Sequence, residues 1–416
     1  MSEALVSNDA MTIPLDEMDV SNPSLFEADA HWPYFERLRV EAPVHYCKDS
    51  AFGPYWSVTR FDDIMAVEKD HETFSSFPAI VIGDQDPSFT VKQFIASDPP
   101  RHDQQRKAVT PAVSPQSLSK MEPLIRSRIG KIMDELPVGE PFNWVDRVSI
   151  ELTTQMLATL FDFPFEERRR LTFWSDMATA SDEIAGDDSV SAEERQAALM
   201  ECLEVFTGIW HERAQQSPEG KYDFITLMAH SEHFQEMDEL EFLGNLILLI
   251  VGGNDTTRNS ISGGVVMLNE NPDEYAKLRA DHSLVPNMVS EIIRYQTPLM
   301  HMRRTATRDT LLGGQQIRKG DKVVMWYVSG NRDATKIDRP DEFIIDRKYA
   351  RNHISFGFGV HRCLGNRLAE MQLRLVWEEI LRRFERIEVV GPVTRLKSNF
   401  VRGITDLPVV LHPVER

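Results

Sequence analysis

Apolar side chains recur every three or four positions over much of the chain, which is the period of an amphipathic helix. We predict helices where this spacing persists, at Trp32–Glu41, Phe61–Glu68, Met121–Glu135, Asp146–Leu160, Ala192–Gln215, Val285–Tyr295 and Leu364–Phe384. A longer helix is predicted over Met237–Asn269, with Asp238 as its N-cap; its centre is apolar on most faces and should be buried. The acidic stretch Ser181–Glu194 is expected to form a mobile connection at the surface.

Strand-like pieces are shorter than the helical ones. They lie at Pro43–Tyr46, Tyr55–Thr59, Thr310–Leu312, Gln316–Ile317, Lys322–Val328, Ile387–Val390 and Leu407–Leu411. No internal repeat and no low-complexity linker interrupts these elements. The pattern therefore predicts a mainly α protein with a minor β region.

Composition and charge narrow the class of protein. The formal net charge of −19 argues against nonspecific binding to DNA or to an anionic membrane, because both attract net positive charge. The three cysteines, Cys47, Cys202 and Cys363, are far apart, so they indicate neither a disulfide framework nor a structural zinc site. The first twenty residues carry no Lys or Arg, and the most apolar stretch, Leu240–Val251, is shorter than the roughly 20 residues of a membrane span. We expect a cytoplasmic protein.

The stretch Phe356–Gly365 carries the most specific chemistry. Its glycines permit a tight turn, because glycine accepts positive φ and a close approach of other backbone. They are Gly357, Gly359 and Gly365. Cys363 follows where a helix is predicted to begin, and the unpaired N–H groups of a helix start favour a thiolate. Two plainer interpretations stay open for this residue alone: a buried free cysteine, and a zinc ligand together with His361, for which the sequence offers no companion ligands.

A second chemical segment, Gly252–Thr257, lies inside the long predicted helix. Glycine in mid-helix costs about 1 kcal/mol relative to alanine, and a flat cofactor lying against the helix would explain that cost. The neighbouring acid and alcohol, Asp255 and Thr256, could carry protons to dioxygen as its O–O bond is cleaved. A helix kink with a satisfied aspartate and threonine is the plainer alternative.

Together these segments resemble the cytochrome P450 superfamily. The cysteine loop matches the pattern Phe-x-x-Gly-x-x-x-Cys-x-Gly at every specified position, and the helix matches (Ala/Gly)-Gly-x-(Asp/Glu)-Thr, with Asn254 where many relatives have an aliphatic residue. The resemblance runs from about Pro33 to the C-terminus. It implies the P450 fold, a helix-rich triangular prism around a buried haem b, with one domain over residues 1–416 and a partly irregular N-terminal extension over residues 1–30.

The resemblance also implies roles for particular residues. Cys363 is expected to be the axial ligand of the haem iron, Thr256 to steady the bound oxygen and Asp255 to relay protons. A buried haem needs cationic donors for its propionates, since an unpaired buried charge is costly. The haem contacts implied by the resemblance are His102, Arg106, Gly252, Arg304, Phe356, His361 and Gly365. Arg303 competes with Arg304 for one of these contacts.

A structural ion pair is expected at Glu291 and Arg294, which lie three apart on one helical face. Alone, such a pair is usually a solvated surface feature. Here it resembles the Glu-x-x-Arg pair that supports the cysteine loop in P450s, whose third partner is an arginine in a Pro-x-Arg-Phe segment. This chain has Glu342 at that position. The candidates for the third partner are Arg332, Arg339 and Arg347.

Electrons must come from another protein, because no flavin or dinucleotide fingerprint occurs in the chain. Arginines outnumber acids around the cysteine, at Arg362, Arg367, Arg374, Arg382, Arg383 and Arg386. A basic patch there would attract an acidic carrier, although plain helix-surface solvation is an equal alternative. The resemblance to bacterial P450s implies a [2Fe–2S] ferredoxin, reduced by an FAD-containing, NAD(P)H-dependent reductase.

The expected substrate is apolar. Segments that line the distal cavity in P450s are apolar here, at Phe77–Ile82, Phe89–Ile95, Leu246–Val251, Leu299–Met302 and Phe400–Val401. The stretches Gly252–Ser260, Met302–Ala306 and Asn352–Met371 resemble the bacterial alkane and fatty-acid terminal hydroxylases, which implies ω-hydroxylation of a medium-length alkyl chain. A hydroxylase of terpenoids or other bulky molecules, a peroxide-driven enzyme, and a haem-binding sensor without turnover are the alternatives.

Overall fold

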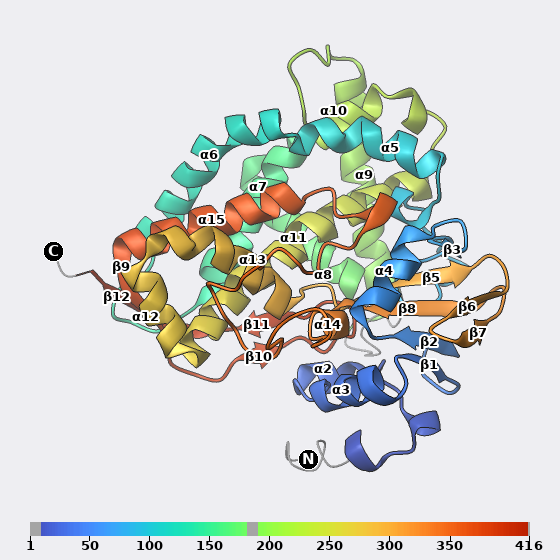
Figure 1. Ribbon diagram of the computed structural model, residues 1–416. Helices are drawn as coiled ribbons and strands as arrows, with labels where there is room; N and C mark the ends of the chain where they lie inside the picture. The colour runs from blue at the N-terminus through green and yellow to red at the C-terminus, as the bar shows by residue number, and fades with distance from the viewer. Residues whose placement is uncertain (1–9, 181–189, 415–416) are drawn as a thin grey trace.

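One long helix, α11 (Glu239–Glu270), forms the centre of the structure, a computed structural model that describes residues 10–180 and 190–414. Asp238 caps this helix as predicted, because its side chain accepts a hydrogen bond from the N–H of Glu241 at 2.7 Å. Most side chains from Glu241 to Leu268 are buried. Figure 1 shows α11 crossing the middle of the molecule with other helices on both sides, so the apolar centre of the helix is enclosed as expected.

The other helices surround α11, and of these α3, α4, α6, α7, α9, α13 and α15 overlap the amphipathic segments predicted above. They are α2 (Pro23–Glu27), α3 (Trp32–Glu41), α4 (Phe61–Lys69), α5 (Arg101–Val109), α6 (Pro115–Asp134), α7 (Glu151–Phe161), α8 (Arg169–Thr179), α9 (Ala192–Ala214), α10 (Phe224–Ala229), α12 (Pro272–Ala280), α13 (Val285–Gln296), α14 (Tyr327–Gly330) and α15 (Asn366–Arg383). Helices α7, α8, α9, α13 and α15 pack directly on α11. The core is therefore mainly helical.

A smaller β region lies beside the helices (Figure 1). Its strands are β1 (Val44–Cys47), β2 (Tyr55–Val58), β3 (Phe74–Ser75), β4 (Phe142–Asn143), β5 (His301–Ala306), β6 (Thr310–Leu312), β7 (Gln315–Ile317), β8 (Lys322–Trp326), β9 (Phe384–Val389), β10 (Thr394–Arg395), β11 (Ile404–Asp406) and β12 (Pro408–Pro413). The main sheet has the order β1-β2-β8-β5-β3, in which only β2 and β8 are parallel. Strands β4, β12 and β9 form a separate antiparallel sheet.

Besides other elements that were not predicted, three segments differ from the sequence-based expectation for a clear physical reason. A π-helical stretch, Val145–Ile150, leads into α7, so the predicted helix is not regular at its start. Strand β5 was not predicted, because buried arginines and half-buried side chains interrupt any apolar–polar alternation along it. The expected surface connection Ser181–Glu194 lies largely outside the described residues, and its end instead starts α9, where Ser191 and Glu194 form a capping box.

Candidate active site

The cysteine loop folds tightly between strand β8 and helix α15. The N–H of Cys363 donates to the carbonyl of Phe356 at 2.8 Å, which closes the loop. Gly357 and Gly359 have φ values of +63° and +67°, so the predicted need for glycine is confirmed at these two positions. It is wrong at Gly365, which has φ of −90° and is the N-cap of α15. A Cβ atom at Gly359 would lie 2.5 Å from the carbonyl oxygen of Glu68, so α4 presses directly on the loop.

The Cys363 side chain is exposed to the cavity, and protein atoms enclose the thiol on its other sides. Burial raises its pKa, and the N–H groups of Gly365 and Asn366 and the charge of Arg106 only partly oppose this effect. The N–H groups at the helix start therefore favour the thiolate as predicted, but burial outweighs their effect on the pKa of Cys363. A bound metal cation would reverse the balance, since a coordinated thiol is deprotonated.

Helix α11 forms the opposite side of the same cavity. Gly252 and Thr256 line it, and the Thr256 hydroxyl donates to the Gly252 carbonyl at 2.9 Å. A Cβ at Gly252 would meet no atom within 4 Å, so the helix presents open space there, as a flat cofactor requires. Glycine is needed at position 253 for a different reason, because a Cβ there would lie 2.8 Å from Leu157 Cδ2 of α7. The second glycine thus serves helix packing.

Asp255 points away from the cavity into the packing between α11 and α8. It is fully buried, accepts a hydrogen bond from the Ser175 hydroxyl at 2.9 Å and pairs with Arg258 at 2.5 Å. Arg258 also pairs with Asp176 of α8 at 2.8 Å. Burial raises the pKa of Asp255, while Arg258 opposes the shift. The neighbouring Asn254 is explained by packing, since its Oδ1 accepts from the Thr153 hydroxyl of α7 at 2.8 Å.

Cationic and imidazole groups gather beside the cysteine. Arg106, Arg304 and His361 all line the cavity with Cys363, and the ring centroids of His102 and His361 are 4.1 Å apart. Within the described chain, His361 Nδ1 and His102 Nε2 are buried and lack a hydrogen-bond partner. Buried ring nitrogens without a partner call for a bound group, and the propionates of haem b fit this set, which also holds the cationic Arg106 and Arg304.

The neighbouring side chains of Arg303 and Arg304 in β5 point in different directions, and this decides which of them faces the cavity. Arg303 turns outward and donates to Asp84 Oδ1 at 2.7 Å and to the Gly83 carbonyl at 3.0 Å. Arg304 lines the cavity instead and pairs with Glu68 at 2.9 Å. The alternation of a β-strand sends adjacent side chains to opposite faces, so only one of the pair can face the cavity.

Glu68 is a part of this site that the sequence did not reveal. It is 4% exposed, and its carboxylate is shared by Arg304 and by the hydroxyl of Tyr327, which is also buried. Burial and the adjacent carboxylate raise the pKa of Tyr327 well above its usual value, so this hydroxyl stays protonated and donates to Glu68. In the sequence, Glu68 is an ordinary acid near a helix end, and no motif marks it.

The third partner of the structural ion pair is Arg347. Glu291 and Arg294 are both fully buried and pair at 2.7 Å, and the Arg347 Nε donates to both Glu291 oxygens at 3.1 and 3.0 Å. Arg294 also donates to the carbonyls of Asn331 and Pro340 at 2.8 and 2.7 Å. Glu342, found where an arginine was expected, contributes its backbone carbonyl to both arginines. The network therefore keeps three charged side chains. Arg347 supplies the charge that was expected from an arginine at position 342.

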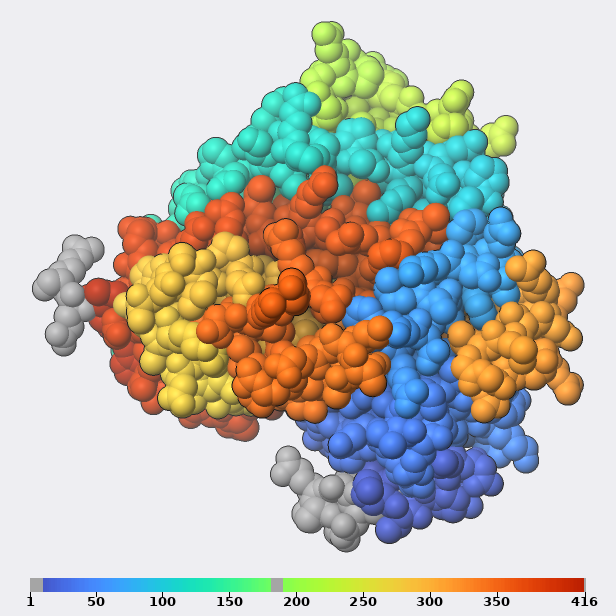
Figure 2. Space-filling model, viewed as in Figure 1, coloured from blue at the N-terminus to red at the C-terminus, as the bar shows by residue number. Residues whose placement is uncertain are grey.

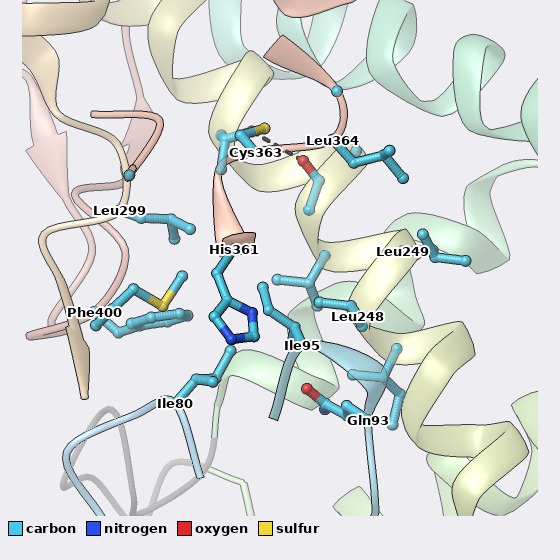
Figure 3. Close-up of a pocket in the computed structure, with 18 of the residues that line it drawn as sticks. Ile80, Gln93, Ile95, Leu248, Leu249, Leu299, His361, Cys363, Leu364 and Phe400 are labelled. Atoms are coloured by element: carbon cyan, nitrogen blue, oxygen red, sulfur yellow. Dashed lines mark hydrogen bonds between the residues drawn. The ribbon is translucent and has the colours of Figure 1, made fainter. Parts of the chain in front are cut away.

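The space between α11 and the cysteine loop is mainly apolar (Figure 3). Each of the five apolar segments predicted to line it contributes side chains, among them Ile80, Ile95, Leu248, Leu249, Leu299 and Phe400. In Figure 3, Cys363 and Gln93 lie at opposite ends of the labelled residues, with His361 between them. The residues that line the cavity thus extend from the cysteine loop to the segment that carries Gln93.

The predicted basic patch is only partly free. Four of its six arginines form ion pairs: Arg374 with Glu122 and Glu378, Arg382 with Glu379, Arg383 with Asp134 and Glu379, and Arg386 with Glu388. In the described residues, no salt bridge involves the exposed Arg362 or Arg367. Arg367 lies in the first turn of α15, and Arg362 precedes that helix in the cysteine loop. Figure 2 shows the face where the segments of α4, α5 and the cysteine loop adjoin. Of the six arginines in the predicted patch, the two without an ion-pair partner among the described residues are therefore the two near the start of α15.

The sequence family model for cytochrome P450 matches residues 54–405. The chain belongs to this family. The solved structure of cytochrome P450-153 from Novosphingobium aromaticivorans is 47% identical, with a TM-score of 0.88 over 95% of this chain and 99% of that one. A linalool 8-monooxygenase of Pseudomonas putida is 36% identical over 96% of this chain and 100% of its own length. A methyl-branched lipid omega-hydroxylase of Mycobacterium bovis is 31% identical over 90% of both chains.

Membership of the cytochrome P450 family identifies the chain as a monooxygenase that uses haem b, O2 and electrons from redox partners. The mainly α fold with a minor β region is the one expected for the family. Of the helices that the structure describes, none has the length and apolar character needed to cross a membrane.

Proposed function

We propose that this P450 hydroxylates the terminal methyl group of medium-length alkyl chains, as found in alkanes and fatty acids. The observation that carries the proposal is the mainly apolar lining of the cavity, which includes Cys363 on one side and Gln93 on another. A terminal C–H bond is stronger than the neighbouring methylene bonds, so selectivity for it must come from geometry that presents only the chain end. The similarity to a methyl-branched lipid omega-hydroxylase supports this reaction class.

Cys363 would hold the haem through its thiolate, and Phe356, Gly365 and Gly252, which line the same cavity, would adjoin it. Haem supplies the oxygen-activating chemistry of the reaction when it is bound. The group of His102, Arg106, Arg304 and His361 would hold its propionates. This assignment uses the ring nitrogens left unpaired on His102 and His361, and each acid beside the group already has a partner: Glu68 pairs with Arg304 and Asp103 with His102.

Thr256 and Asp255 handle protons in this scheme. The Thr256 hydroxyl lies in the cavity wall on α11, where it can donate to a group bound between the helix and the cysteine loop. Asp255 is one residue earlier but faces Ser175 and Arg258, so it must swing away from Arg258 to deliver a proton to the cavity side. Its raised pKa suits a proton donor.

Electrons come, in this proposal, from a [2Fe–2S] ferredoxin that is reduced by an FAD-containing, NAD(P)H-dependent reductase. The unpaired charges of Arg362 and Arg367 support an acidic carrier that docks at the start of α15.

Product analysis tests the proposed reaction. The purified protein, supplied with ferredoxin, reductase and NADH, is expected to convert octane mainly to 1-octanol and dodecanoic acid mainly to its ω-hydroxy acid. Mainly subterminal alcohols from both substrates would refute it. The absorption spectrum of the reduced, carbon monoxide-bound protein tests the iron ligand separately, and the Cys363→Ser variant should lose the thiolate spectrum and turnover.

Hydroxylation of terpenoids is a second candidate, because the 36% identity to a linalool 8-monooxygenase covers nearly the whole chain. Such substrates are branched and bulkier than an alkyl chain. Titration of the haem spin state with linear and with branched ligands separates the two candidates. Tighter binding of linalool than of octane or dodecanoic acid would favour the terpenoid reaction.

A further inference from the structure

The charged residues of the cavity wall fall into two groups. Arg106, Arg304 and His361 belong to the cluster beside Cys363. Arg195 is the remaining cationic side chain among the described residues that line the cavity, and it comes from α9, a helix that contributes nothing to the cysteine loop. The polar residues Gln85 and Thr179 also belong to the wall. An otherwise apolar cavity thus has one cation that the haem site does not use.

The surroundings of Arg195 place it at the mouth of the cavity. It is half-buried in the first turn of α9, one turn before the buried Leu199, which lines the cavity too. Asp86, next to Gln85 in the wall, attracts Arg195 electrostatically. Asp86 is fully exposed to solvent, so Arg195 lies where the apolar interior meets water.

The Arg195 guanidinium is available to bind an anion. No salt bridge joins it to any residue of the described ranges, whereas Arg170 of α8 and Arg213 of α9 are both paired with carboxylates. The Asp86 carboxylate accepts instead from the N–H and hydroxyl of Ser88, at 2.8 and 2.7 Å. The N–H groups at the start of α9 are capped by Ser191. The free positive charge at this site is therefore the arginine itself.

We propose that Arg195 binds the carboxylate of a fatty acid whose alkyl chain fills the cavity with its methyl end toward Cys363. This inference rests on the proposed function and names its substrate class. A guanidinium pairs with a carboxylate through two parallel hydrogen bonds, which fixes one end of the chain. Fixing that end also sets which carbon reaches the cysteine side, so terminal selectivity gains a second determinant. An alkane or a terpene alcohol has no anion to match this charge.

The test compares an acid with its uncharged ester. Dodecanoate and methyl dodecanoate are titrated into the haem-loaded protein, and the spin-state change gives each dissociation constant. We expect Arg195→Gln to weaken dodecanoate binding about tenfold or more, as for the loss of a charge-assisted hydrogen bond, and to leave the ester unchanged. Arg195→Lys, which keeps the charge, should retain part of the affinity. Arg170→Gln, a paired arginine on α8 that lies outside the cavity, is the matched control.

Two results would overturn the inference. One is unchanged dodecanoate affinity in Arg195→Gln, and the other is an equal loss for acid and ester, which would mean that Arg195 only shapes the mouth. Either result leaves the proposed function standing if the wild-type protein still converts octane mainly to 1-octanol. Mainly subterminal products from both octane and dodecanoic acid would refute the proposed function, whatever the titrations show.

Discussion

Each acid buried at this site has a cation within contact distance, and this pairing decides what the acid can do. Asp255 is held by Arg258, Glu68 by Arg304, and Glu291 by two arginines. Taking a charge out of water is costly, so a buried acid that loses its partner destabilises the protein or changes protonation. Asp255 differs from Glu68 and Glu291, because it shares its arginine with the half-exposed Asp176. Arg258 therefore keeps a second carboxylate partner if Asp255 turns away.

Replacing Asp255 by asparagine tests its role in proton delivery. We expect Asp255→Asn to lower turnover by about 100-fold, in the range of a lost general acid, with little change in substrate affinity. Asp176→Asn is the matched control, because it removes the other partner of Arg258 and keeps the Asp255 carboxylate. Turnover and spin-state titration are measured for both variants. Equal losses in the two would assign the effect to the position of Arg258 rather than to a proton from Asp255.

Replacing Glu68 by glutamine tests whether Arg304 faces a propionate. In the haem-free protein the change leaves a buried guanidinium unpaired, and we expect a loss of about 3 kcal/mol in the free energy of unfolding. With haem bound, the propionate still pairs with Arg304, so the loss should be clearly smaller. Tyr327→Phe removes only a hydrogen bond to Glu68 and should cost about 1 kcal/mol in either form. Urea unfolding measures all four values, and equal losses for Glu68→Gln with and without haem would contradict the assignment.

At the scale of elements, the sequence predicted the helices along which buried positions recur every three or four residues. Trp32–Glu41 was predicted to the residue, and α11 within two residues at each end. Periodicity could not predict β5, whose buried arginines are stabilised by partners far away in the sequence, at Glu68 and Asp84. The same holds for Arg347, which reaches Glu291 only through the tertiary fold. Motifs located the cysteine loop and the oxygen-side helix, but the contacts between α4 and the loop needed the structure.

The contact between α4 and the cysteine loop makes Gly359 sensitive to any side chain. Gly359→Ala would place a Cβ against the Glu68 carbonyl and would keep a positive φ that alanine disfavours by about 1–2 kcal/mol. We expect lower thermal stability and weaker haem retention. Gly208→Ala in α9 is the control, since its Cβ meets nothing within 4 Å and alanine stabilises a helix interior by about 1 kcal/mol relative to glycine. A wild-type melting temperature and haem content in Gly359→Ala would show that the loop can shift away from α4.

At the scale of the whole molecule, charge is distributed unevenly. The chain carries a net charge of −19, yet two unpaired arginines stand at the start of α15, near the cysteine. Repulsion by the rest of the molecule opposes the approach of an acidic carrier, so a local positive site should determine where such a carrier docks. Arginines that are already paired with neighbouring acids contribute little to the positive potential at this site.

This distribution predicts which arginines control electron transfer. Arg367→Glu should slow the second-order reduction of the protein by an acidic ferredoxin about tenfold at low ionic strength, because a charge at the edge of an interface acts mainly on the association rate. Arg382→Glu makes the same change of charge on the same helix, but at a residue already neutralised by Glu379, and should have a smaller effect. Stopped-flow reduction measures both rates. The difference should shrink as added salt shortens the screening length to about 10 Å at 0.1 M. Equal slowing by the two variants would mean that the carrier responds to net charge and not to the start of α15.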